Sequence, residues 1–355
     1  MDAELQMIEG KPVLRFERRL RHSPEKVWRV VTEPGEMKHW FPAEVEIDGR
    51  TMRFTFPDAA PVDADGGEGE LLESDPPKVF AFRWINDVLR FEILPREDGC
   101  LLVFTAVVTN KLSVGRDAPG WTTCLDALVA HADGRKFEPP TDWLPRIEHY
   151  IAKFGLDEGT DGPDGVLFVR DLVWKPLDEV WQLLTEGTEN EVPVRAAHPG
   201  LTPGRITRSE APRLLEFEWL QDGAPKGVVR WEFEHIPLQG TTVTLFQENA
   251  HGPEALAAWH VHLELFFAAT QGEIRCPWPK GAGGRTDEAL RRALKSETGA
   301  AAGENGRANR CHSCCTRSTS RAQSGAERPS RLGAVDSCSS TARRRSPGSG
   351  ARASS

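Results

Sequence analysis

The sequence predicts an α+β protein in which two copies of one domain stand in tandem ahead of a tail without a fold. Two observations lead to this prediction: three blocks of sequence recur in the same order in the two halves, and the composition changes sharply near residue 281. Each half is expected to hold a strand, a helix, a run of strands and a long closing helix. Strands grouped between helices favour an antiparallel α+β sheet over a parallel, doubly wound one.

The repeat is carried by three pairs of segments. FERRLRHSPEKVWRVVTE (16–33) returns in outline as FVRDLVWKPLDEVWQLLTE (168–186), each running from an apolar strand through a proline into a helix. ESDPPKVFAFRW (73–84) matches RSEAPRLLEFEW (208–219), and GWTTCLDALVAH (120–131) matches AWHVHLELFFAA (258–269). Self-similarity in a fixed order is the signature of a duplicated structural unit. In the first pair, Trp28, Thr32 and Glu33 stand where the second half has Trp181, Thr185 and Glu186.

The first copy begins with a strand and a short helix. Apolar and polar residues alternate over part of VLRFERRL, which indicates a strand. Ser23 followed by Pro24 predicts a helix start, because serine caps free backbone N–H groups and proline suits the first turn. Pro34 and Gly35 end this helix near Glu33. Strands are then expected over 79–84, 88–94 and 101–108, with a turn at 96–99.

A long helix closes each copy. Trp121, Leu125 and Leu128 recur with helical spacing in the first, and Leu263 and Phe266 belong to a similar stripe in the second. Between the copies lie a short helix over 143–155 and an acidic, Gly-rich stretch over 157–165 that is expected to be a flexible linker. We therefore assign domain 1 to 10–132, a linker with a short helix to 133–165, domain 2 to 166–272 and a tail to 281–355.

The tail differs from the body in composition. From Gly299 onward it holds ten Arg, no Lys and three acidic residues, and it lacks Phe, Trp, Tyr, Ile and Met. Such a segment cannot bury enough apolar surface to offset the entropy cost of ordering, so residues 281–355 are expected to be disordered. The Arg-without-Lys bias resembles translation of a GC-rich gene in another reading frame, a hypothesis that resequencing of the locus would test.

Charge and cysteine content narrow the function classes. The net charge is −9 although the tail is basic, so the body ahead of the tail is acidic. An acidic body argues against nucleic acid as a partner, because phosphate binding needs a basic face. The sequence contains no run of about 18 apolar residues, so no membrane span is expected. The N-terminus does not resemble a secretory signal. Cys100, Cys124 and Cys276 lie far apart in the body, so no disulfide framework is expected and the sequence predicts a reducing, cytoplasmic location.

The first copy resembles the SRPBCC (START/Bet v 1-like) superfamily and, within it, bacterial proteins related to the C-terminal domain of the Hsp90 ATPase activator Aha1. The resemblance rests on SPEKVWRVVTEPGEMKHWF, on the strand that ends at Trp84 and on GWTTCLDAL, and it covers about 13–155 well and 166–270 weakly. It implies a helix-grip fold, in which a curved antiparallel sheet wraps a long C-terminal helix, often around an apolar cavity. After Glu186 the second copy lacks the Trp-Phe pair of the first, so we expect the cavity in domain 1.

An aromatic set in the first copy is the candidate ligand site. A mainly apolar cavity between sheet and helix is a usual form of small-molecule site. The alternative is ordinary core packing, because each of these side chains also suits a core. The set comprises Trp40, Phe41, Phe54, Phe56, Phe80, Phe82, Trp84, Phe91, Trp121 and Leu125.

Other clusters do not predict a catalytic, metal or cofactor site. His260 and His262 would face different sides of a helix, whereas His260 and Glu264 would pair on a partly buried polar face. RCHSCCT (310–316) holds only half of a zinc motif, and WPKGAGGRT (278–286) lacks the Gly and Lys that a phosphate loop requires. We therefore expect no catalytic residue, no metal and no cofactor.

Three functions stay open. The first is a binding protein for a hydrophobic or amphipathic small molecule in the domain 1 cavity. The second, which the resemblance implies, is a co-chaperone-like module whose partner is an Hsp90-type chaperone. The third is a cyclase- or hydrolase-like enzyme, which would need an acid–base pair in the cavity. Because no such pair is identifiable from spacing, a role without catalysis is favoured.

Overall fold

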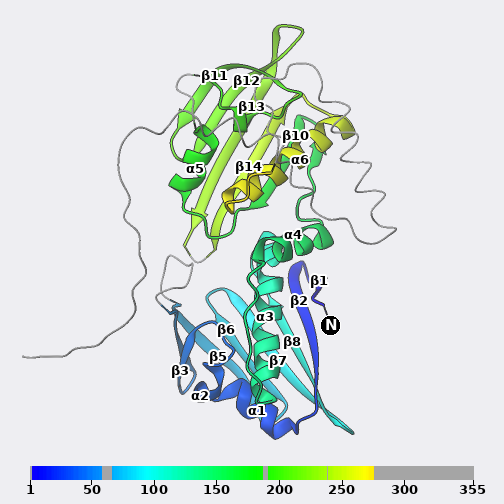
Figure 1. Cartoon of the computed structure of the whole chain (residues 1–355), viewed down its shortest axis with the longest axis vertical. Coiled ribbons are helices and arrows are strands. Elements are labelled where there is room, and N and C mark those ends of the chain that lie inside the picture. The colour runs from blue at the N-terminus through cyan, green and yellow to red at the C-terminus, as the bar shows by residue number, and fades with distance from the viewer. Residues whose placement is uncertain (1, 58–65, 187–190, 238, 276–355) are drawn as a thin grey trace, which may run out of the picture. The chain divides into compact units, whose positions relative to one another are not determined.

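The computed structural model describes residues 2–57, 66–186, 191–237 and 239–275 (Figure 1). The described residues form two antiparallel sheets, and along the chain a 19-residue helix follows the last strand of each sheet. The predicted α+β fold class, with two helix-grip domains, is therefore confirmed. The predictions for the tail over 281–355 and for the Cys-His cluster over 310–316 lie outside the described residues.

The first sheet has eight strands, each antiparallel to its neighbours. Phe104 lies opposite Phe16 on one neighbouring strand and opposite Phe91 on the other, so a row of phenyl rings crosses the middle of the sheet. The strands predicted over 79–84, 88–94 and 101–108 are confirmed. In order across the sheet the strands are β1 (Glu4–Ile8), β2 (Lys11–Leu20), β8 (Gly99–Val107), β7 (Asp87–Arg96), β6 (Val79–Trp84), β5 (Glu68–Asp75), β4 (Thr51–Thr55) and β3 (Glu44–Asp48).

Helix α1 (Pro24–Thr32) begins where the sequence predicts. The Ser23 hydroxyl oxygen accepts a hydrogen bond from the backbone N–H of Lys26 at 3.4 Å, and Pro24 occupies the first turn. The backbone leaves the helical conformation at Glu33, and the one-turn helix α2 (Pro34–Met37) follows. This segment positions the Trp-Phe pair that enters the core below.

The closing helix of the first half, α3 (Val114–Ala132), starts earlier than the predicted 120–131. It continues directly from a 3-10 turn at Lys111–Ser113, and Pro119 lies inside it. A proline disfavours helix, but Val114 and Ala118 ahead of it are both fully buried, so packing offsets that cost. Figure 1 shows α3 lying along one face of the first sheet.

The second sheet has six strands in the described residues. Residues 160–162, expected in a flexible linker, instead form an edge strand that pairs in register with the strand after it, Gly162 opposite Gly165 and Thr160 opposite Leu167. A two-residue turn joins these strands. The order across the sheet is β11 (Thr202–Glu210), β12 (Leu214–Gln221), β13 (Ala224–Ile236), β14 (Gly240–Glu248), β10 (Gly165–Asp171) and β9 (Thr160–Gly162).

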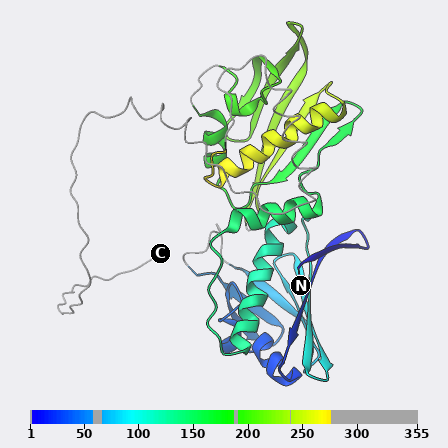
Figure 2. The ribbon, with the colours of Figure 1, turned by 45° about the vertical axis from the view of Figure 1, so that its right-hand side comes forward.

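The helices of the second half repeat the placement of those in the first. Helix α5 (Leu177–Thr185) follows β10, a 3-10 turn at Val194–Ala196 follows it, and α6 (Gly252–Thr270) closes the half. The predicted short helix between the halves is confirmed as α4 (Trp143–Phe154), which ends at Gly155 in the left-handed conformation with φ 60°. Figure 2 shows α6 crossing one face of the second sheet.

Each half has its own apolar core between sheet and closing helix. The first core gathers phenyl and indole rings of the sheet and of α2 against α3. The second is built around Trp231 of β13 and Trp259 of α6, both fully buried, with Phe266 packed on Trp231 at a centroid distance of 5.2 Å. Within the described residues, no helix is both long and apolar enough to cross a membrane.

Candidate functional site

The ten side chains predicted to line a ligand site in the first half come together in one core cluster. Seven of them are buried, and Phe56, Trp84 and Trp121 are half-buried against the others. They come from the segment after α2, from β4 and the residues just after it, from β6 and β7, and from α3. The interior of the first half is therefore aromatic, as the sequence predicts, and a ligand cavity among these rings stays a prediction.

These rings pack directly against one another. The Phe41 ring lies 5.1 Å from that of Trp84 and 5.9 Å from that of Trp121, centroid to centroid. The indole N–H groups of Trp40 and Trp84 donate to backbone carbonyl oxygens of Val30 and Gly66, each at 2.8 Å. Aromatic rings at such distances are in contact. A ligand that entered between these particular rings would have to separate them.

The second half contains a pocket of about 610 Å³. It lies between the ends of β12 and β14, the segment before β11 and the first half of α6, which is between the sheet and the closing helix. Its apolar wall is formed by Leu201, Trp219, Leu220, Ala250, Ala255, Ala257 and Ala258, and its polar groups come from His198, Thr202, Gln221, Asp222, Gln247, Asn249, His251 and Glu254.

A buried polar pair fixes one wall of this pocket. Gln247 of β14 is 4% exposed, and its side-chain oxygen accepts a hydrogen bond from the indole N–H of Trp259 at 2.6 Å. The indole N–H of Trp219, on β12, donates to the backbone oxygen of Glu248 at 2.8 Å. Because a buried amide is costly unless hydrogen-bonded, the Gln247–Trp259 bond holds the amide in one orientation beside the pocket.

His198 supplies a neutral imidazole to the same pocket. It is 8% exposed, its ring lies edge-to-face on Trp259 at 4.7 Å, and its Nδ1 accepts the backbone N–H of Gly200 at 3.2 Å. That acceptor role places the ring proton on Nε2. Burial, together with the nearby His262 imidazole, lowers the pKa of His198 to about 3. At neutral pH His198 is therefore an uncharged hydrogen-bonding group and a weak general base.

The titratable side chains that line the pocket are two histidines and two carboxylates. Among the described residues that line it there is no Ser, Cys, Tyr, Lys or Arg. Covalent catalysis by serine or cysteine thus has no nucleophile there. The two charged carboxylates, Asp222 and Glu254, come from the turn after β12 and from the first turn of α6.

The two halves differ in sequence at the segment that borders this pocket. Trp219 matches Trp84 in the repeat, and Trp84 packs on Phe41 of the Trp-Phe pair. The second half lacks that pair after Glu186 and has GTENEVPVRAAHPG instead. Without those two rings Trp219 borders the pocket, and His198 of the replacement segment lines it. The segment that stands in place of the aromatic pair thus contributes to the lining of the pocket.

The fold of each half is that of a helix-grip protein, an antiparallel sheet closed by a C-terminal helix. The family comparison agrees with this class. Residues 21–133 match the family described as "Activator of Hsp90 ATPase homolog 1-like protein". The resemblance predicted for the first half is thereby confirmed. No curated protein gives a match.

Several solved structures are similar to parts of the chain. A conserved protein of unknown function from Enterococcus faecalis is 22% identical, with 43% of this chain and 90% of that chain covered and a TM-score of 0.37. CalU16 from Micromonospora echinospora is 19% identical over 43% of this chain and 93% of that chain, with a TM-score of 0.35. DynU16, from the dynemicin biosynthetic locus, is 18% identical over 73% of this chain and 94% of that chain, with a TM-score of 0.32.

Proposed function

We propose that the protein binds a small amphipathic molecule in the pocket between β12, β14 and α6 of its second half. The observation that carries the proposal is the pocket itself, whose volume of about 610 Å³ falls in the range typical of small-molecule sites, roughly 300–1,000 Å³. About half of the lining residues are polar, so the pocket is more polar than most small-molecule sites and suits an amphipathic ligand better than a wholly apolar one.

The lining indicates the chemistry of the ligand. The Trp219 ring and the alanines of α6 offer a flat apolar surface for a hydrocarbon or aromatic portion. The neutral His198 and the buried Gln247 amide suit an uncharged hydroxyl or carbonyl group. Asp222 and Glu254 border the pocket, so a polyanionic ligand is disfavoured. We also propose that the second half is a divergent copy of the first, specialised by loss of its Trp-Phe pair.

The interior of domain 1, where a ligand cavity is predicted, is the alternative binding site. Its ten residues line the interior between sheet and α3, where rings now touch. Phe41 and Trp121 are in contact there, so a ligand placed between these two rings would separate them. The pocket of the second half needs no such rearrangement and is the preferred site.

Ligand-induced stabilisation tests the preferred site. The full chain is screened by thermal unfolding against medium-chain fatty acids and aromatic polyketides, and by native mass spectrometry for a co-purified molecule. A ligand present at about 100 times its Kd should stabilise the native state by about 2.7 kcal/mol. The proposal fails if the purified protein carries no small molecule and the panel leaves the melting temperature unchanged.

A pair of matched substitutions locates the binding. Ala257→Phe places a ring in the pocket from α6, whereas Ala152→Phe makes the same change at an exposed position of α4 away from it. The stabilisation by ligand should disappear in the first variant and persist in the second. If both variants bind as the unmodified protein does, the ligand lies elsewhere, and the domain 1 interior becomes the site to test.

A second candidate function is protein interaction. The match of residues 21–133 to a family described as activator of Hsp90 ATPase supports a co-chaperone role for the first half. The direct test is the ATPase rate of an Hsp90-type chaperone with and without the full chain. An unchanged rate together with no detectable complex would remove this candidate. A cyclase- or hydrolase-like activity is the third; it requires an acid–base pair, for which the histidines and carboxylates of the pocket are the groups to test.

A further inference from the structure

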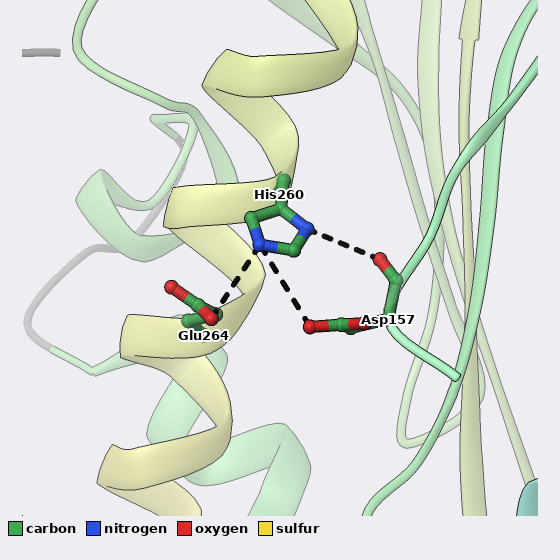
Figure 3. A group of neighbouring side chains, drawn as sticks. All are labelled: Asp157, His260 and Glu264. Carbon is green, nitrogen blue, oxygen red and sulfur yellow. Dashed lines mark hydrogen bonds and ion pairs between the residues drawn. The ribbon is translucent and has the colours of Figure 1, made fainter. Parts of the chain in front are cut away.

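A second cluster in the same half has the geometry of a metal site and does not line the pocket. Asp157 comes from the segment between α4 and β9, while His260 and Glu264 lie one turn apart on α6 (Figure 3). One potential ligand atom from each side chain lies within 4.8 Å of the other two. Asp157 is buried and His260 is half-buried, whereas the Glu264 side chain is 37% exposed. The cluster is therefore reachable from solvent.

The imidazole of His260 is oriented as in metal-binding histidines. Its Nδ1 faces the backbone oxygen of Asp157 at 3.3 Å, a partner that can only accept, so the Nδ1 atom carries the proton. This leaves the lone pair on Nε2 directed at the two carboxylates (Figure 3). Histidines that ligate metals commonly donate their other ring N–H to a backbone carbonyl, which fixes the tautomer and the ring.

The distances within the cluster are longer than those of close hydrogen bonds and similar to the spacing of metal ligands. His260 Nε2 lies 3.5 Å from a Glu264 oxygen and 3.8 Å from an Asp157 oxygen, both longer than the 2.7–2.9 Å of the hydrogen-bonded histidine–carboxylate pairs elsewhere in the described residues. A tetrahedral ion with ligands at about 2.1 Å holds those ligand atoms about 3.4 Å apart. Small side-chain movements would therefore place all three ligands around one ion.

Other histidine–carboxylate pairs in the described residues show the contrast. His22 with Asp133, His131 with Glu36 and His251 with Asp161 lie at 2.8, 2.7 and 2.9 Å, which are hydrogen-bond distances. His149 and Asp2 are 3.5 Å apart, but there the Lys153 ammonium occupies the same carboxylate oxygen at 2.6 Å. The His260 cluster thus differs in having two carboxylates, each set back from one imidazole nitrogen.

The charge around the cluster also favours a cation. Arg170 is 5% exposed, and its guanidinium donates to the backbone oxygens of Asp157 at 3.3 Å and of His260 at 3.4 Å, so it supports the main chain behind the ligands. With His260 neutral, two carboxylates and one guanidinium leave a net negative charge. Either a bound cation or a protonated His260 would neutralise it, and the experiment below separates these two states.

We propose that Asp157, His260 and Glu264 bind a divalent transition-metal ion through one imidazole nitrogen and two carboxylate oxygens, with a solvent-facing position for water. Imidazole suits Zn²⁺, and carboxylates suit Mn²⁺ and other harder ions, so a mixed set of this kind takes ions of either type. Because Asp157 precedes β9 and the other ligands lie on the last helix, the ion would tie the two ends of the second half together.

Binding of Mn²⁺ to the full chain is the direct test, followed by the loss of the electron paramagnetic resonance signal of free Mn²⁺. Mn²⁺ is the chosen probe because the cysteines at 311, 314 and 315 would compete for Zn²⁺ but attract Mn²⁺ weakly. We expect about one bound ion per chain, together with a rise in melting temperature. Failure to bind Mn²⁺ at millimolar concentration overturns the proposal and leaves an ion pair with protonated His260.

Three variants assign the site. His260→Gln and Glu264→Gln each remove a ligand charge or nitrogen while keeping the side-chain size, and each should weaken Mn²⁺ binding at least tenfold. His22→Gln, in a histidine–carboxylate pair with the Lys26 ammonium 3.5 Å from the ring, is the matched control and should bind as the unmodified protein does. Glu264 is partly exposed, so that variant stays informative if His260→Gln folds poorly. Binding that survives both ligand substitutions overturns the assignment.

Discussion

The protein should lose stability in mild acid because of two buried histidines in its second half, and His262→Gln should remove part of that loss. His262 of α6 is 2% exposed, and its Nε2 donates to the backbone oxygen of Arg195 at 2.9 Å. Burial lowers the pKa of His262 from 6.5 to about 4. His198 beside it has its pKa lowered to about 3, so both rings are held neutral in the folded state.

The expected magnitude follows from the difference in proton uptake. Above pH 6.5 the imidazole is neutral in both states, so His262 makes stability independent of pH there. Below that pH the unfolded chain takes up a proton that the folded state refuses until about pH 4. Stability therefore falls with pH by about 1.4 kcal/mol per unit for each such histidine. At pH 5 this loss amounts to about 2 kcal/mol for His262 alone.

Urea unfolding at pH 5.0, 6.0 and 7.5 measures this effect in the unmodified chain and in His262→Gln. The glutamine keeps a donor for the Arg195 carbonyl but cannot be protonated. The variant starts less stable at pH 7.5, and the gap between the two proteins should close by about 2 kcal/mol at pH 5. His22→Gln serves as a control in the first half. Parallel stability curves for the unmodified chain and His262→Gln would refute the reasoning.

Three further changes test other contacts. Trp259→Ala removes a fully buried ring and the donor to Gln247, and it should lower the free energy of unfolding in urea by about 3–5 kcal/mol. Burial raises the pKa of Asp117 on α3 from 3.8 to about 7, so over that interval the carboxyl ionises in the unfolded chain but stays protonated in the folded state, and stability falls as the pH rises. Asp117→Asn should therefore gain on the unmodified chain by about 1.4 kcal/mol per pH unit between about pH 4 and 7, and a constant difference would contradict this. Asp161→Ala removes the carboxylate that accepts the Gly252 N–H at 2.8 Å, and thermal unfolding should show a loss of about 1 kcal/mol.

Signals that act over a few residues predicted much of the fold. Ser23 and Pro24 mark the start of α1, and the alternation around Phe82 marks β6, because capping and pleating depend on near neighbours. The acidic and Gly-rich composition of residues 157–165 predicts a flexible linker, whereas residues 160–162 form strand β9. The segment contains Pro163, Asp164 and Gly165 in a row, a turn signal, and the structure uses that turn to join β9 and β10.

The candidate sites were harder to predict because they depend on distant residues and on empty space. Asp157 and His260 are 103 positions apart, and spacing on one helix could reveal only the His260–Glu264 pair. The pocket in the second half results from side chains that are absent rather than present. A sequence shows a core residue such as Trp219 but not whether another ring covers it. The ligand cavity is therefore predicted in the first half, where aromatic residues are most numerous.

The contacts of Asp157 and Asp161 also bear on how the chain folds as it is made. The partner of Asp161 is Gly252, which is synthesised 91 residues later. The partner of Asp157 is His260, which is synthesised 103 residues later. During synthesis β9 can pair with β10 as soon as both have left the ribosome, while the start of α6 arrives only after four more strands. The second half therefore cannot close until its last helix emerges. Until then, two acidic groups and one face of a sheet remain open to chaperones and proteases.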